Sequence, residues 1–155
     1  MLKLVLVALC SAAVALGSGA KSPAWLSIES PVNPYDQSTR GDVLLVHATL
    51  HTGETQPTDL TGSAEGLVNG SRRTVALHFD GTSRPNVFGV RRQWPNEGTW
   101  ILRIALRETT AIVTFDRTGA VASAVVPTTT SSGMALPRVV SRTDVDSALS
   151  AAAHR

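Results

Sequence analysis

Short alternations of apolar and polar residues recur along most of the chain, and the clearest covers residues 100–106. Four large apolar residues occupy alternate positions in this run: Trp100, Leu102, Ile104 and Leu106. This two-residue period is typical of a strand with one buried face. A proline, an asparagine and a glycine fall within residues 95–98, and such a cluster is a turn signal. Because the β-rich run 86–93 precedes this turn, the sequence predicts a strand–turn–strand corner with Trp100 as a core anchor.

Similar runs follow one another at a spacing of roughly ten residues between positions 24 and 127. The predicted strands are residues 25–29, 42–51, 65–68, 73–79, 86–93, 100–106, 109–115 and 120–126. Asn69-Gly70 predicts a tight hairpin, because both residues tolerate a positive φ. Seven or eight strands without an intervening helix indicate an all-β fold of two packed antiparallel sheets. A jelly roll or an open barrel is the structural alternative.

The N-terminal residues 1–20 have the pattern of a secretory signal peptide. Lys3 provides a positive charge, residues 4–17 form an uncharged apolar run, and three small residues end at Ala20. We therefore expect cleavage after Ala20, a secreted or periplasmic mature protein, and no membrane span after cleavage. An uncleaved anchor and a lipid attachment at Cys10 are the alternatives.

The C-terminal residues 128–155 differ in composition from the predicted sandwich domain, residues 21–127. A Thr/Ser tract at 128–133 predicts a linker. An alanine-rich stretch at 144–153, with Thr143 as its cap, predicts a short terminal helix on a mobile tail.

Charge and cysteine content exclude several classes of function. Without Lys3, 13 of the 14 basic residues remain against 12 acidic ones, a balance that favours neither nucleic acid nor membrane binding. Cys10 is the only cysteine, so the mature chain has no thiol nucleophile and no thiolate metal site. Residues 72–117 hold eight arginines, whereas 21–71 hold six acidic residues. We expect strands from these two segments to neutralise each other; a basic face for an anionic partner is the alternative.

Catalytic motifs are missing from the sequence. It contains no nucleophile elbow, no phosphate-binding glycine loop and no dinucleotide fingerprint. The carboxylates lie singly in predicted turns, so none is paired for acid–base chemistry. We therefore predict that the protein is not an enzyme and uses no cofactor.

Three histidines form the one candidate metal site. His47 and His51 point the same way on one predicted strand, about 13 Å apart, which is too far to share a metal directly. His78, on the outward face of another strand, would complete a two-histidine pair if the two strands are neighbours. A copper or zinc site is thus possible only with further ligands, and solvent-exposed histidines are the alternative.

Arginines and one tryptophan form the candidate contact surface for a partner. The predicted outward-facing strip consists of Arg91, Arg103 and Arg107, with Arg92 beside an exposed Trp94. Guanidinium groups bind carboxylates or phosphates in a bidentate manner. Equally, charged residues on strand faces protect sheet edges and pair across strands.

Residues 62–106 resemble the YtkA-like/FixH-like group of exported immunoglobulin-like domains. The shared features are the run 75–79, the strand start at 87–90, and the Gly98-x-Trp100-x-Leu102 pattern. The resemblance implies an immunoglobulin-like β-sandwich that acts as a binding or accessory module for a protein or envelope partner. Some members of the group are linked to copper handling or oxidase assembly. Here Met134 is the single methionine after the leader, so no ligand residue is carried over.

Overall fold

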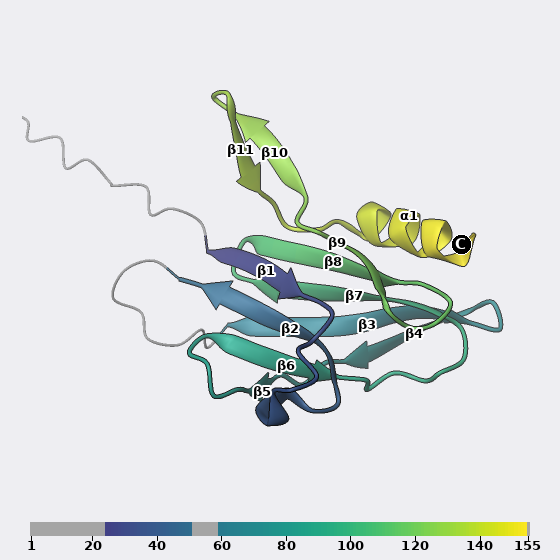
Figure 1. The fold of residues 1–155 in the computed structure, drawn as a ribbon. Helices are drawn as coiled ribbons and strands as arrows, with labels where there is room; N and C mark the ends of the chain where they lie inside the picture. The colour runs from purple at the N-terminus through teal and green to yellow at the C-terminus, as the bar shows by residue number, and fades with distance from the viewer. Residues whose placement is uncertain (1–23, 51–58, 155) are drawn as a thin grey trace, which may run out of the picture.

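Two antiparallel β-sheets pack face to face in the computed structural model, which describes residues 24–50 and 59–154 (Figure 1). In the first sheet the strand order is β1 (Trp25–Glu29), β2 (Asp42–Thr49), β6 (Val87–Arg91) and β5 (Asp80–Gly81). In the second it is β4 (Ser71–Ala76), β3 (Leu60–Val68), β7 (Thr99–Leu106), β8 (Thr109–Phe115) and β9 (Val121–Val125). A 3-10 turn, η1 (Gln37–Thr39), lies between β1 and β2. The predicted signal peptide, residues 1–20, falls outside the described residues.

The strand order is that of an immunoglobulin domain. The sheet β1-β2-β6-β5 corresponds to strands A, B, E and D, and β4-β3-β7-β8 corresponds to C′, C, F and G. Strand β9 extends the second sheet by one strand. The predicted all-β sandwich is therefore confirmed, although the described residues hold nine strands in the two sheets rather than seven or eight.

The predicted corner carries the chain from one sheet to the other. Strand β6 lies in the four-stranded sheet and β7 in the centre of the five-stranded one. Gly98, at φ +86°, closes the turn, and a Cβ at this position would overlap the carbonyl oxygen of Leu67. Trp100 opens β7 on the core side, where its indole lies over Gly66 of β3 so closely that no Cβ fits there. Its Nε1–H donates to the carbonyl oxygen of Glu97 at 2.7 Å.

The core between the sheets comes from the alternating residues of the central strands. Leu44, Val46 and Ala48 of β2 face Leu102, Ile104 and Leu106 of β7, and all six are almost completely buried. Asn69 and Gly70 both have positive φ, which confirms the predicted hairpin between β3 and β4.

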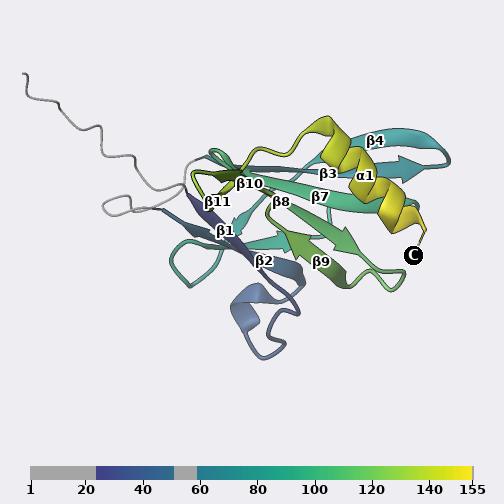
Figure 2. The same ribbon diagram turned by 90° about the horizontal axis from the view of Figure 1, so that it is seen from above.

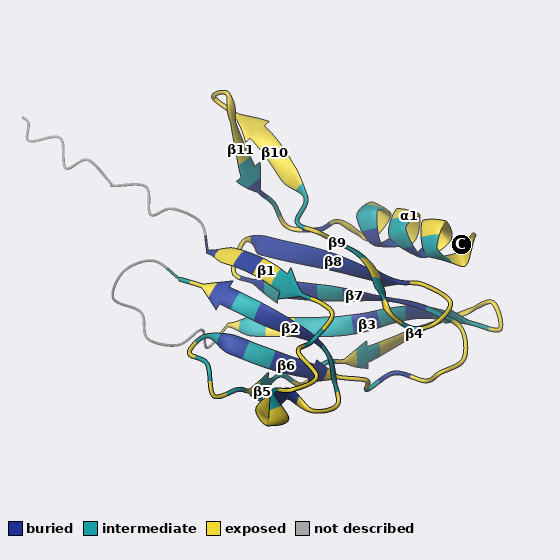
Figure 3. Cartoon of the chain, viewed as in Figure 1, coloured by how far each residue is buried: buried dark blue, intermediate teal, exposed yellow. Residues whose placement is uncertain are grey.

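Strand β8 is buried along its whole length, because both of its own faces are covered (Figure 3). One face belongs to the core, and α1 (Arg142–Ala153) covers the other (Figure 2). Val145 and Leu149 of α1 pack on Ile101 and Ile112 of the sheet. Within the described part of the chain, no helix is long and apolar enough to span a membrane.

The C-terminal region differs from the sequence prediction. Residues 128–133, predicted as a linker, begin a hairpin of β10 (Thr128–Ser131) and β11 (Met134–Pro137) that projects from the sandwich (Figure 1). The helix cap is Ser141 rather than Thr143, and Ser141 and Asp144 form a reciprocal capping box. The helix is docked, because the sheet supplies the apolar surface that its own sequence lacks.

Other boundaries also shift. Asp80-Gly81, outside the predicted strands, pairs with β6 as a short edge strand. Strand β3 begins at Leu60, before the predicted strand 65–68. Strand β2 ends at Thr49, so Leu50, predicted as part of this strand, lies outside it. His51, the last residue of the predicted strand, falls outside the described residues.

We expect Trp100→Ala to lower the free energy of unfolding by about 3–5 kcal/mol, as deletion of a buried aromatic side chain usually does. The matched control is Trp25→Ala, because Trp25 is 47% exposed and Trp100 only 5%. We expect the control to change stability by less than about 0.5 kcal/mol. Equal effects of the two substitutions in urea unfolding would contradict the packing described here.

Acidification should weaken the anchor of α1. The Arg138 guanidinium and the Ser141 groups hold the pKa of Asp144 well below its usual value of 3.8. A carboxyl group with a lowered pKa stabilises the fold above its unfolded pKa and loses that effect as the pH falls through the folded pKa. Asp144→Asn should therefore lower the thermal midpoint at neutral pH, and its difference from the parent should shrink as the pH falls below about 4.

The control for this series is Glu97→Gln, an exposed carboxyl group outside the helix, whose replacement should leave the midpoint unchanged at every pH. A difference between Asp144→Asn and the parent that stays constant on acidification would refute the proposed anchor.

Candidate functional site

Half of the arginines in the basic segment are neutralised by acidic side chains from elsewhere in the chain. The pairs are Arg84–Glu29, Arg91–Asp42, Arg107–Asp59 and Arg72–Asp146. Three of these four acids come from residues 21–71, as the expected neutralisation between the two segments requires. The other four arginines of this segment are Arg73, Arg92, Arg103 and Arg117.

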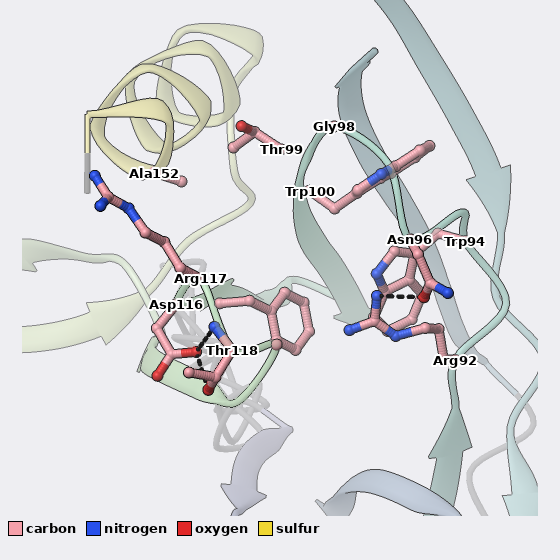
Figure 4. Close-up of a pocket in the computed structure, with 12 residues that line it drawn as sticks. Arg92, Trp94, Asn96, Gly98, Thr99, Trp100, Asp116, Arg117, Thr118 and Ala152 are labelled. Carbon is pink, nitrogen blue, oxygen red and sulfur yellow. Dashed lines mark hydrogen bonds between the residues drawn. The ribbon is translucent and has the colours of Figure 1, made fainter.

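Two of the remaining arginines, Arg92 and Arg117, line one pocket at an end of the sandwich (Figure 4). We call it the corner pocket, because the corner between β6 and β7 forms one wall. The turn between β8 and β9 forms the opposite wall, and Ala152 of α1 also borders the pocket. Its volume is about 380 Å³, within the range of sites that take small ligands or single side chains.

Arg92 is held in place on the corner side of the pocket. Its guanidinium carbon lies 5.4 Å from the centre of the Trp94 ring, within cation–π distance. Its Nη1 donates to Oδ1 of Asn96 at 3.2 Å. Trp94 in turn packs on Phe115, with the ring centres 5.3 Å apart. The aromatic pair thus orients Arg92 without neutralising its charge.

Arg117 lies on the other side of the pocket and extends toward the end of α1 (Figure 4). The nearest acidic residue in its own turn is Asp116, but that carboxylate is committed to the turn. Its Oδ1 accepts from the backbone N–H and hydroxyl of Thr118 at 2.8 and 2.6 Å, and from the N–H of Ala120 at 3.0 Å. These hydrogen bonds, led by that of the Thr118 hydroxyl, lower the pKa of Asp116.

The pocket therefore presents two guanidinium groups, and neither forms an ion pair with any acidic side chain of the described residues. Such a pair can bind a carboxylate or a similar oxyanion by charge-assisted hydrogen bonds. The carboxylate in the wall of the pocket, that of Asp116, is already hydrogen-bonded within its own turn.

The predicted arginine strip is not formed. Arg91 lies in the four-stranded sheet, whereas Arg103 belongs to β7 of the other sheet. The prediction treated β6 and β7 as neighbouring strands, but the corner takes them into different layers. Arg107 lies in the turn after β7 with φ +53° and contacts Asp59. Arg91 lies between Asp42 and Asp80, at 3.4 and 3.8 Å.

The prediction that Trp94 is exposed is also wrong, because its side chain is only 4% exposed. Trp94 lines the pocket and contacts the guanidinium group of Arg92. Arg117, which lies between the predicted strands 109–115 and 120–126, was missed altogether. The signal that would have identified it is the pairing of β8 with β7, which brings the turn after β8 beside the corner.

The histidines do not come together. His47 lies opposite Val87, the first residue of β6, while His78 is held by Gln93, beyond the last residue of β6. The two histidines therefore lie at opposite ends of that strand. His51 falls outside the described residues. Among the described residues, no three histidine or acidic side chains are grouped to hold a metal ion.

His47 instead belongs to an ion-paired cluster on the four-stranded sheet. Its Nε2 lies 2.7 Å from Oε2 of Glu29, which also accepts from Nη1 of Arg84 at 3.1 Å. Arg84 first, and then His47, lower the pKa of Glu29. The cluster joins β1, β2 and the loop before β6, so its role is structural.

Comparisons with known proteins find no family model, no curated protein and no solved structure that matches this chain.

Proposed function

We propose that this chain is a non-catalytic immunoglobulin-like binding module of the cell envelope, exported by its N-terminal signal peptide. In this proposal the corner pocket is the contact site, and it receives an acidic side chain of a protein partner. The observation that carries the proposal is that Arg92 and Arg117 line the same concave surface, where the local carboxylate is already hydrogen-bonded.

The distribution of charge supports this assignment. Elsewhere, Arg84, Arg91 and Arg107 each form an ion pair with an acidic side chain from residues 21–71, so their charges stabilise the fold. At the corner pocket the charges remain available. Paired guanidinium groups recognise planar carboxylates with directional hydrogen bonds, and a pocket of about 380 Å³ has room for one side chain.

The alternative function, a copper- or zinc-binding accessory protein, gains less support. It would need His47, His51 and His78 to approach one another, and His47 and His78 lie at opposite ends of β6. The histidine positions therefore favour the binding module.

The test uses the mature chain as bait for chemical crosslinking in envelope extract from the native cells. We expect a protein partner that is captured by the parent and lost, by about tenfold or more, with the double variant Arg92→Glu/Arg117→Glu. Charge reversal removes the charge-assisted hydrogen bonds and repels the acidic group of the partner. Capture should also weaken as the salt concentration rises.

The matched control is Arg73→Glu, which reverses an exposed arginine on β4 that does not line the corner pocket. It should capture the partner as the parent does. Retention of the partner by the double variant would overturn the proposal, and so would an extract from which the parent captures no partner.

A further inference from the structure

A second group of arginines lies in a groove on the outer face of the five-stranded sheet, between α1 and the edge strand β4. We call it the helix groove; its polar lining comes from Arg72, Thr74 and Glu65 of the sheet, Arg103 of β7, and Ser141 and Arg142 at the start of α1. Its volume is about 440 Å³. It shares no residue with the corner pocket.

Arg103 is the unusual member of this group. Among the described residues, three arginines are partly buried: Arg84, Arg103 and Arg138. Arg84 and Arg138 each bind a carboxylate through both terminal nitrogens, in Glu29 and Asp144 respectively. Arg103 makes no hydrogen bond or ion pair within the described part of the chain. Its guanidinium nitrogens are not among the buried unpaired atoms of the described residues, so they remain accessible to a negatively charged ligand.

The acidic side chains that the structure describes near the helix groove do not form an ion pair with Arg103. Glu65 accepts hydrogen bonds from the hydroxyls of Ser63 and Thr74, at 2.9 and 3.0 Å. Its remaining ionic contact is with Arg72, whose Nε lies 3.8 Å from Oε2. Arg72 also pairs with Asp146 of α1. The carboxylates of Glu65 and Asp146 therefore both contact Arg72.

Two guanidinium groups in the groove make no contact with an acidic side chain of the described residues, and the three arginines exceed Glu65 and Asp146 by one positive charge. Arg103 extends from the sheet, and Arg142 belongs to the exposed first turn of α1, where it contacts no acidic side chain of the described residues. Guanidinium groups that approach from different elements match a tetrahedral oxyanion, which accepts hydrogen bonds in several directions. The volume exceeds that of a bare ion and is in the range of small-molecule sites.

We propose that the helix groove is a binding site for a phosphate or sulfate ester of sugar size, with Arg103 and Arg142 as its oxyanion ligands. This site is separate from the corner pocket and does not depend on the function proposed there.

The test is calorimetric titration of the mature chain with three probes: a hexose 6-phosphate, the hexose 6-sulfate and the unmodified hexose. We expect the phosphate or the sulfate to bind and the unmodified hexose not to bind. The ester that binds more tightly shows whether the groove prefers a phosphate or a sulfate group. Arg103→Gln and Arg142→Gln should each weaken the binding by about tenfold or more, since each removes charge-assisted hydrogen bonds. Arg73→Gln, outside the groove, should bind as the parent does.

A measurement of stability separates this role from a structural one. Because Arg103 has no acid partner, Arg103→Gln should leave the thermal midpoint of the free protein unchanged or raise it. Arg138→Gln should lower it, because Asp144 loses its partner. If Arg103→Gln fails to fold, its role is structural and the assignment of Arg103 is overturned.

Arg142→Gln, on the helix surface, tests the groove independently of Arg103. Equal binding by the parent and both groove variants would overturn the proposal. So would equal binding of the unmodified hexose, or no binding of either ester at millimolar concentration.

Discussion

The packing of Trp100 on Gly66 is the interaction on which the rest of the structure depends. The indole occupies the space that a side chain at Gly66 of β3 would otherwise fill, which favours the pairing of Gly66 with Trp100 in the neighbouring strand β7. The hydrogen bond from Nε1 to the carbonyl of Glu97 ties the same ring to the corner. One side chain thus determines both the register of the central strands and the path of the chain between the sheets. The corner forms one wall of the corner pocket, so the path of the chain there determines the shape of the pocket.

Charge is distributed around this frame in two ways. On the four-stranded sheet, arginines and acids from different strands lie side by side, as in the cluster of Glu29, His47 and Arg84. Such pairs hold strands together and leave little charge for a ligand. At the corner pocket and the helix groove, by contrast, guanidinium groups face concave surfaces whose carboxylates are already occupied. The same residue type therefore serves the fold in one place and is free to bind in another.

Alternation in the sequence located β7 to within one residue, because burial of one face imposes a two-residue period. The bounds of β1 and β8 were also predicted, although β8 is buried at every position and has no such period. Alternation could not locate β5 or the β10–β11 hairpin, since short or exposed strands carry no such period. The helix was expected, but its docking was not, because the apolar surface that holds it belongs to Ile101 and Ile112 of the sheet.

The candidate sites were harder to predict, because they depend on which strands are neighbours. Arg92 was among the candidates and lines the corner pocket, but Trp94 was expected on the surface and Arg117 was missed. The strip of Arg91, Arg103 and Arg107 failed for the same reason: the corner separates β6 from β7 into two layers. Residue type identified the chemistry, and only the sheet order showed which guanidinium groups share a surface.

The central claim is that the arginines without an acid partner are the ones available to ligands. The most direct measurement follows the arginine Nε–Hε resonances of the mature chain by NMR during titration with inorganic phosphate. The account predicts saturable shifts for Arg92, Arg103, Arg117 and Arg142, and none for the ion-paired Arg84 and Arg138. Equal shifts for paired and unpaired arginines, or shifts that never saturate, would contradict it.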